Sequence, residues 1–256
     1  MSKDDAELKV QSLFGDSITN LVYLGETKSA VETFDFGLSA NGKNYFIQIT
    51  KRGGFLLTMS ANALEDAAQE NQTSSQAEEN STDVEQSEVA TVKKEDVNST
   101  KNGKAIDVAL EFAKKLDIKN LKSVWSAASN GVCYVNLAPV QDDIILYPDL
   151  IKAKVDLSSN QVIGWEASSY AFNHVEREDL IPQLSKEEAK KLVSNNLTID
   201  NQQLCVIPLD FVGETLAYEF SGTFDDYQYY LYIDAYTGNQ VRVLRVIQTD
   251  QGDLVL

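Results

Sequence analysis

Ile233-Asp-Ala-Tyr-Thr-Gly238-Asn-Gln-Val241 places a tight turn between two apolar strands. An aspartate can hydrogen-bond the backbone of its own turn, and a glycine four positions later tolerates a left-handed backbone. Similar chemistry occurs in Asp156-Leu-Ser-Ser-Asn160 and in Thr50-Lys-Arg-Gly-Gly54, each followed by an apolar strand pattern. We therefore predict three equivalent hairpin turns. In the second and third, the structural residues are Asp156, Asn160, Asp234 and Gly238.

A short amphipathic helix is predicted ahead of each turn, at a similar distance from it. Apolar residues recur at helical spacing from Ser2 to Leu13, from Lys104 to Leu116 and from Ser185 to Leu197. The first and third stretches open with capping-box patterns, Ser2-x-x-Asp5 and Ser185-Lys-Glu-Glu188. These patterns mark helix N-termini because side chain and backbone then satisfy each other's hydrogen bonds.

Strand patterns follow each predicted helix. They cover residues 20–26, 34–38 and 45–49, then 122–127, 133–137 and 151–155, then 204–208, 216–220 and 229–233, and a fourth run begins at Phe55, Val162 or Val241. The expected fold class is α+β, with three repeats of one helix packed on a three- to four-stranded antiparallel sheet. The repeats would occupy residues 1–59, 102–180 and 181–256. We expect the second and third to pack together, because one copy alone would be marginally stable.

The segment between the first and second repeats, residues 60–101, has a different composition. It is rich in acidic residues, asparagine and serine, and it has no aromatic residue, glycine or proline. Low hydrophobicity combined with net negative charge does not offset the entropy of ordering a chain. We therefore predict a disordered acidic linker at 60–101.

The whole chain is acidic, which excludes several classes of partner. It has 256 residues, a formal net charge of −17 and a pI of about 4.4. Nucleic-acid binding needs clustered lysine and arginine, so none is expected, and anionic lipid is equally disfavoured. No apolar run is long enough to cross a membrane. We expect membrane association only through an anchor that this chain lacks.

The residues that could carry catalysis are few. His174 is the single histidine and has no recognisable nucleophile context, so we interpret it as an ordinary surface or loop residue. The carboxylate pairs Asp142-Asp143 and Asp225-Asp226 sit beside turn residues, where solvated charge is the simpler interpretation. Cys133 and Cys205 are expected to be buried free thiols, with a disulfide as the alternative. We predict no catalytic residue, no metal site and no cofactor.

One strand of the third repeat carries a candidate partner surface. When the copies are aligned, Ile47, Ala153 and Leu231 should face their helices, and alternation sends the neighbouring residues to the other face. In the second repeat those neighbours are Lys152 and Lys154, as on a solvated face. The third repeat places aromatic residues there and just before, namely Phe224, Tyr227, Tyr230 and Tyr232. These rings either pack against the second repeat or form an exposed patch that docks a protein partner.

The strand, turn and strand of residues 233–241 resemble the PepSY domain. Three successive copies, the first closed by Gly53-Gly54-Phe-Leu-Leu-Thr-Met59, are similar to the C-terminal region of the YpeB family of spore-germination proteins. The long acidic segment at 60–101 departs from the short connection expected in that family. The resemblance covers most of the chain outside this segment.

The resemblance implies a binding role rather than catalysis. It suggests a spore germination protein that binds and stabilises or restrains a cortex-lytic peptidoglycan hydrolase of the SleB type until germination. Such a protein would lie outside the cytoplasm in the spore envelope, at the outer face of the inner membrane or in the cortex. The alternative is a secreted peptidase inhibitor similar to a PepSY propeptide. A cell-wall enzyme built on a carboxylate pair is a third, weaker hypothesis.

Overall fold

The computed structural model describes residues 1–61, 102–209, 213–249 and 252–255. The fold is α+β, with many strands and few helices, and the chain divides into two compact units at residues 1–103 and 104–256. Most of the linker predicted at 60–101 lies outside the described residues. Ser60 and Ala61 are described, and they complete strand β4 (Leu56–Ala61).

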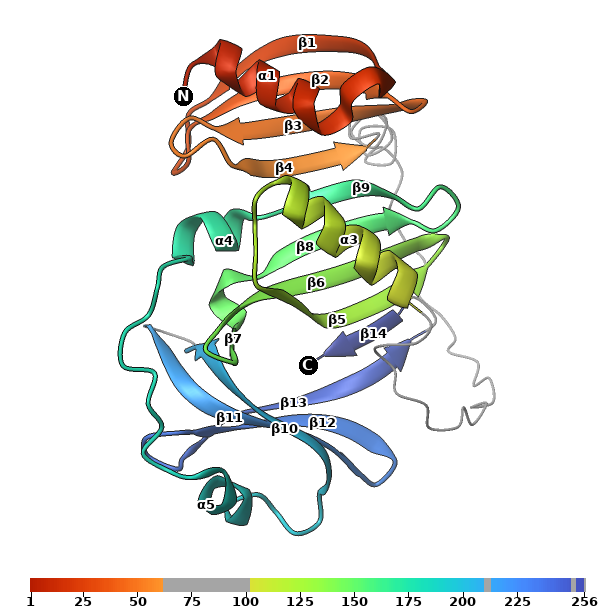
Figure 1. The fold of residues 1–256 in the computed structure, drawn as a ribbon. Coiled ribbons are helices and arrows are strands. Elements are labelled where there is room, and N and C mark those ends of the chain that lie inside the picture. The colour runs from red at the N-terminus through yellow and green to blue at the C-terminus, as the bar shows by residue number, and fades with distance from the viewer. Residues whose placement is uncertain (62–101, 210–212, 250–251, 256) are drawn as a thin grey trace, which may run out of the picture. The chain divides into compact units, whose positions relative to one another are not determined.

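The first unit is one helix on a four-stranded antiparallel sheet. Helix α1 (Lys3–Phe14) and the short η1 (Gly15–Ser17) precede β1 (Ile18–Thr27), β2 (Thr33–Ala40), β3 (Lys43–Thr50) and β4, in spatial order β1-β2-β3-β4. Figure 1 shows α1 crossing one face of this sheet. Ser2 and Asp5 form the capping box, and Ala6 and Val10 are buried on the inner side of the helix. We call residues 1–61 the N-terminal segment.

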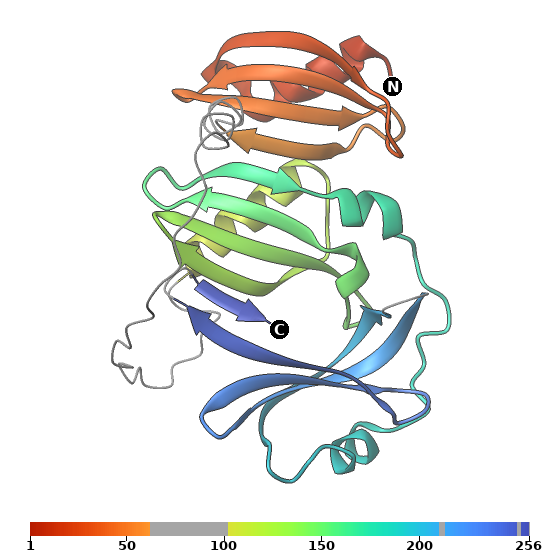
Figure 2. The same cartoon turned by 180° about the vertical axis from the view of Figure 1, so that it is seen from behind.

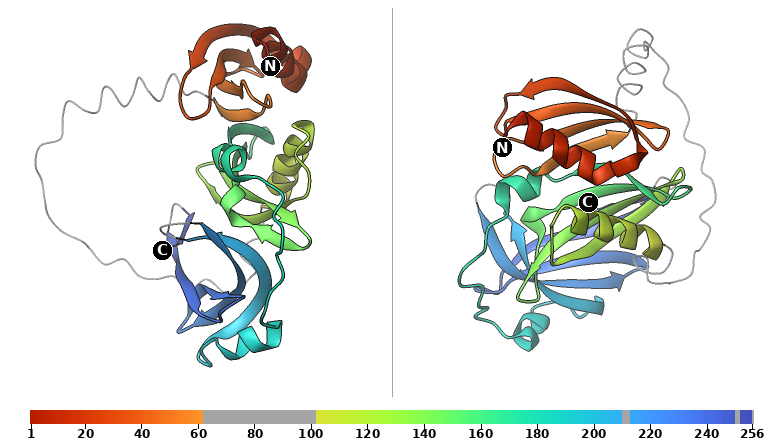
Figure 3. Two further views of the ribbon diagram at one scale, coloured as in Figure 1. Left: turned by 90° about the vertical axis from the view of Figure 1, so that its left-hand side faces the viewer. Right: turned by 45° about the horizontal axis from the view of Figure 1, so that its top comes forward.

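The second unit begins with another helix on antiparallel strands, which we call the middle segment, residues 102–180. Helix α3 (Gly103–Lys115) is followed by β5 (Leu121–Ser129), β6 (Val132–Gln141), β8 (Ile151–Asp156) and β9 (Gln161–Glu166). Figure 3 shows α3 lying on one face of these strands. Its alanines at 105, 109 and 113 are buried, and the Phe112 ring meets Trp165 edge-on at 5.2 Å. Between β6 and β8, the chain adds β7 (Ile144–Leu146) and η2 (Tyr147–Asp149).

The C-terminal segment, residues 181–255, has a much shorter helix. It contains α5 (Lys186–Lys191), β10 (Thr198–Pro208), β11 (Glu214–Phe224), β12 (Tyr227–Asp234), β13 (Gln240–Thr249) and β14 (Gly252–Val255). The prediction that this helix continues to Leu197 is wrong, because the helix ends at Lys191. Leu192 is consequently 51% exposed, whereas Ala189 and Val193 are buried against the sheet.

Strand β7 joins the middle and C-terminal segments. It pairs with β6 on one side and in parallel with β10 on the other, so one sheet runs β9-β8-β6-β7-β10-β11-β12-β13-β14 through the second unit. Figure 2 shows this sheet curving, and β14 lies beside β5. Ile144 and Leu146 of β7 enter the core under α5, while Ile145 points to the opposite side. The inserted strand therefore contributes to both cores.

Among the described residues, four hairpins have two-residue loops in which both residues have left-handed backbone. The pairs are Asn41-Gly42, Asn130-Gly131, Asp142-Asp143 and Asp225-Asp226, with φ between 45° and 77°. Two-residue hairpin loops favour positive φ at both positions because their twist then matches that of the strands. Asn, Asp and Gly tolerate this conformation best. The two aspartate pairs therefore have a structural explanation in the turns that they form.

Candidate partner-binding surface

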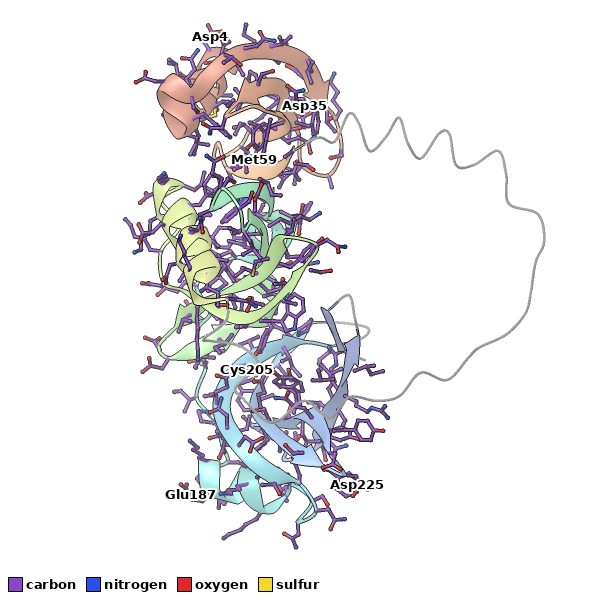
Figure 4. The ribbon with its side chains drawn as sticks, turned by 90° about the vertical axis from the view of Figure 1, so that its right-hand side faces the viewer. Asp4, Asp35, Met59, Glu187, Cys205 and Asp225 are labelled. Carbon is purple, nitrogen blue, oxygen red and sulfur yellow. The ribbon has the colours of Figure 1, made fainter. Side chains whose placement is uncertain are left out.

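The end of the β11–β12 hairpin carries an exposed aromatic group. Phe224 and Tyr227 are cross-strand neighbours, 39% and 48% exposed, and the Phe224 ring lies 6.4 Å from that of Tyr229. The guanidinium of Arg245 on β13 lies 4.1 Å from the centre of the Tyr227 ring, which is a cation–π contact. Figure 4 shows Asp225 at the outer end of this hairpin. We call Phe224, Tyr227, Tyr229 and Arg245 the hairpin patch.

The short helix α5 explains why the hairpin patch is exposed. Cross-strand partners share a face, so Phe224 and Tyr227 lie on the same face as the pair Phe220 and Leu231. Phe220 and Leu231 are buried in the core beneath α5. An α-helix rises about 1.5 Å per residue, so the six residues of α5 cover only part of strands of eight to eleven residues.

Two other predicted surface residues, Tyr230 and Tyr232, lie on the opposite face of β12. Tyr232 is only 7% exposed and Tyr230 is half-buried. Both belong to a cluster that combines residues of the middle and C-terminal segments, which we call the interface cluster. Its buried members are Ala138, Ile145, Cys205, Ile207, Ala217 and Tyr232. The two tyrosine rings therefore contribute to packing between these segments.

A buried carboxylate lies next to the interface cluster. Glu219 is 2% exposed, and it accepts hydrogen bonds from the Tyr147 hydroxyl at 2.6 Å and from Gln203 Nε2 at 2.7 Å. Burial, together with the negative charge of Glu219, raises the pKa of Tyr147 and of Tyr232. Both phenols therefore keep their protons, which lets Tyr147 donate to the carboxylate. The network satisfies a polar group that would otherwise be costly to bury.

A second buried network was not predicted from the sequence. Asp149 of η2 is fully buried, and both of its oxygens accept from the Arg177 guanidinium, at 2.8 and 2.9 Å. Arg177 also donates to Glu214 of β11, at 2.6 and 2.9 Å. Hydrogen bonds to Glu214 and Asp149 raise the pKa of Arg177, so its charge is fixed. The only sequence signal was one arginine within the acidic run Glu176–Asp179.

His174 and the two cysteines, Cys133 and Cys205, pack against neighbouring side chains or lie buried. His174 Nδ1 lies 2.8 Å from Asp149 Oδ2, and its ring stacks on Tyr170 with centroids 4.3 Å apart. Cys133 and Cys205 are both buried and free, and burial raises the pKa of each thiol. A thiol with a raised pKa forms little of the reactive thiolate. Figure 4 shows Cys205 among the side chains between the strands.

The two aspartate turns have matching geometry. Asp156 Oδ1 accepts from the backbone nitrogens of Ser158 and Ser159, and Asp234 Oδ1 accepts from those of Tyr236 and Thr237. In each, a backbone bond of 2.8 or 2.9 Å links the last residue to the aspartate carbonyl. Those last residues, Asn160 and Gly238, have φ of 53° and 76°.

The Thr50–Gly54 turn has a different arrangement. Gly53 and Gly54 both have positive φ, of 82° and 65°. The turn closes over the same number of residues as the Asp234 turn, because the Thr50 amide donates to the Phe55 carbonyl at 2.9 Å and the Asp234 amide donates to the Asn239 carbonyl at 2.8 Å. The Phe55 amide in turn donates to Thr50 Oγ1 at 2.8 Å. This turn therefore shares residue chemistry and length with the aspartate turns, and it differs in the backbone amide that its side chain binds.

In the part of the chain that the structure describes, no three His, Cys, Asp or Glu side chains are grouped so as to hold a metal ion. Within those residues, no helix is both long enough and apolar enough to span a membrane.

Two family models match adjacent parts of the chain. Residues 87–180 match the model described as "YpeB sporulation, PepSY1 and PepSY2 domains", and residues 183–244 match "Peptidase propeptide and YPEB domain". Residues 87–180 and 183–244 are therefore PepSY domains of the YpeB type. The resemblance to PepSY-containing YpeB proteins that the turn motifs indicated is thereby confirmed.

Curated relatives and a solved structure agree with this assignment. The chain is 31% identical over 146 residues to the sporulation protein YpeB of Halalkalibacterium halodurans, and 28% identical over 137 residues to that of Bacillus subtilis. These alignments cover 57% and 53% of this chain, but only 33% and 30% of the relatives. The Bacillus megaterium YpeB C-terminal domain has the same fold, with a TM-score of 0.73 at 22% identity over 96% of this chain and 97% of that one.

Proposed function

We propose that this chain is a non-catalytic module that binds a cortex-lytic peptidoglycan hydrolase of the SleB type and stabilises or restrains it until germination. Its place would be the spore envelope, outside the cytoplasm. The match to a family model and to relatives named as sporulation proteins supports the setting. The observation that carries the binding role is the hairpin patch, because tyrosine, phenylalanine and arginine are enriched in protein interfaces.

We further propose that the N-terminal, middle and C-terminal segments are three PepSY-type repeats of a helix and antiparallel strands. The same order of elements in each segment supports this division. The domains would be residues 1–59, 102–180 and 181–256, separated by the acidic segment 60–101. In this arrangement the third repeat is the copy whose helix is shortest, so it offers the widest uncovered sheet face.

The test is retention of purified hydrolase on the immobilised chain. Phe224→Ser combined with Tyr227→Ser should reduce affinity at least tenfold, since each residue is exposed and its loss costs little stability. The matched control is Tyr134→Ser in the middle segment, which is 39% exposed and lies under Lys154 at 5.7 Å. Equal retention by the double variant and the wild type would contradict the assignment of the hairpin patch.

A second function rests on the match at residues 183–244, whose model is described as a peptidase propeptide domain. On this alternative the chain inhibits a secreted peptidase. A metallopeptidase assay with and without the chain separates the two proposals. Inhibition of the peptidase with no retention of the hydrolase would favour the inhibitor.

A further inference from the structure

The connector between β9 and α5, residues 167–185, exposes large apolar side chains. Figure 1 shows it running along the outside of the second unit from helix α4 (Ser168–Asn173) to α5. Phe172 is 56% exposed, Val175 is 61% exposed and Ile181 is 72% exposed. Single exposed apolar residues are common on proteins, but three within ten residues of one ordered segment are a concentrated feature.

This connector is held in place by buried bonds at Arg177. The Gln141 side chain pairs with the backbone of Arg177 in both directions, at 2.7 and 3.0 Å. The Arg177 guanidinium is only 6% exposed and is bound by Asp149 and Glu214. Asn173 adds a bond to the Pro148 carbonyl at 2.8 Å. Residues on both sides of Arg177 are therefore displayed in a fixed conformation.

The exposed charges of the connector are all negative. Glu176, Glu178 and Asp179 are exposed, and among the described residues none of the three carboxylates forms an ion pair. The positive charge of Arg177 is already neutralised by two carboxylates. The connector thus presents three exposed carboxylates, with the exposed apolar side chains of Val175 and Ile181 on either side of them.

We infer that the connector is a docking surface for a segment of a partner protein that combines lysine or arginine with apolar residues. Exposed apolar area favours association, and the three carboxylates select a basic partner by charge complementarity. Because Arg177 fixes the backbone beforehand, binding does not have to order this part of the surface.

The inference is separate from the hairpin patch and does not require the partner to be a hydrolase. Its probe is a synthetic eight-residue peptide that alternates lysine with valine, with a matched peptide that alternates glutamate with valine. Each is added to the isotope-labelled full chain, and amide resonances are followed by NMR. The lysine peptide should shift resonances of residues 172–181, more strongly at low salt than at high salt. The glutamate peptide should leave them unchanged.

Two variants decide whether the connector is responsible. Glu176→Lys with Glu178→Lys and Asp179→Lys should weaken binding of the lysine peptide at that position at least tenfold. The control triple variant, Asp4→Lys with Asp107→Lys and Glu111→Lys, changes the net charge equally on exposed positions of α1 and α3 and should bind at that position as the wild type does. Val175→Ser with Ile181→Ser should also weaken binding of the lysine peptide at the connector. That result would show that charge attraction alone does not account for the binding.

Several results would overturn the inference. These are shifts confined to other parts of the chain, equal effects of both peptides, or equal losses in the connector and control variants. The hydrolase assay reports separately on the proposed function. Peptide binding at the connector with no hydrolase retention would refute the hydrolase proposal and leave this inference standing. The reverse outcome would refute the inference alone.

Discussion

Strands β8 and β12 hold equivalent places in the middle and C-terminal segments, yet their outer faces have opposite surroundings. Lys152 and Lys154 of β8 are exposed, and Lys154 lies over the Tyr134 ring. The aligned residues of β12, Tyr230 and Tyr232, lie in the interface cluster with residues of the middle segment. One strand pattern therefore serves as a solvated face in one segment and as an interface in the other. The residue type on the outer face indicates which.

The largest expected effect comes from removing the rings on β12. Tyr230→Ala with Tyr232→Ala should lower the free energy of unfolding by about 4–6 kcal/mol, because buried area and the packing around Glu219 are lost together. Lys152→Ala with Lys154→Ala removes the same number of side chains from β8 and should change it by less than about 1 kcal/mol. Urea unfolding of both variants measures the difference. If both double variants lose the same free energy of unfolding, the outer faces of β8 and β12 contribute equally to stability, which would contradict this comparison.

The next effect concerns the ion pairs of Arg177 with Asp149 and Glu214, which join the middle and C-terminal segments and which we call the anchor. Asp149→Ala leaves the Arg177 guanidinium buried with Glu214 alone, and breaking a buried pair in this way typically costs about 3–5 kcal/mol. The comparison is Asp156→Ala, which removes a carboxylate from a partly exposed turn and should cost about 1 kcal/mol. If Asp149→Ala unfolds as the wild type does, the anchor does not stabilise the second unit.

Much of the fold could be predicted from local patterns. Each of these patterns depends on neighbours within a few positions, namely the strand alternation, the two capping boxes and the turn residues. The predicted strands of all three segments overlap the observed ones. The predicted helix of the C-terminal segment is longer than the observed one. Leu192 and Leu197 continue the helical spacing of the sequence, but the helix ends at Lys191. Exposure of Leu192 depends on where the helix ends, which periodicity does not specify.

The contacts between segments could not be predicted in this way. Nothing in the local sequence indicated that β7 would pair in parallel with β10. Arg177 bonds Asp149, which lies 28 residues before it in the chain, and Glu214, which lies 37 residues after it. Tyr230 and Tyr232 left two alternatives open for the same reason, since alternation assigns a face to a side chain but not its surroundings.

The turns provide a finer comparison of the same two segments. Gly238→Val should cost about 2 kcal/mol or more, because a β-branched residue tolerates positive φ poorly and its Cβ would lie 2.9 Å from Leu192 Cδ1. Gly238→Asn should cost less, as Asn160 already adopts this conformation at the matching position. Thermal unfolding of both variants is the measurement. A valine that is tolerated as well as asparagine would mean that backbone strain is not what selects the residue.

The smallest effect is a pH dependence at the Asp234 turn. Burial by itself would raise the pKa of Asp234, but hydrogen bonds from Thr215, Thr237 and Tyr236 outweigh it and lower the pKa below its ordinary value of 3.8. A carboxyl whose pKa is lower in the folded state stabilises the fold above its unfolded pKa, and that contribution is lost as pH falls through the folded value. Asp234→Asn should therefore be less stable than the wild type at pH 7, and the difference should shrink below about pH 4. Urea unfolding at pH 7, 4 and 3 tests this, and a difference that stays constant with pH would mean that the hydrogen bonds do not depend on the carboxylate charge.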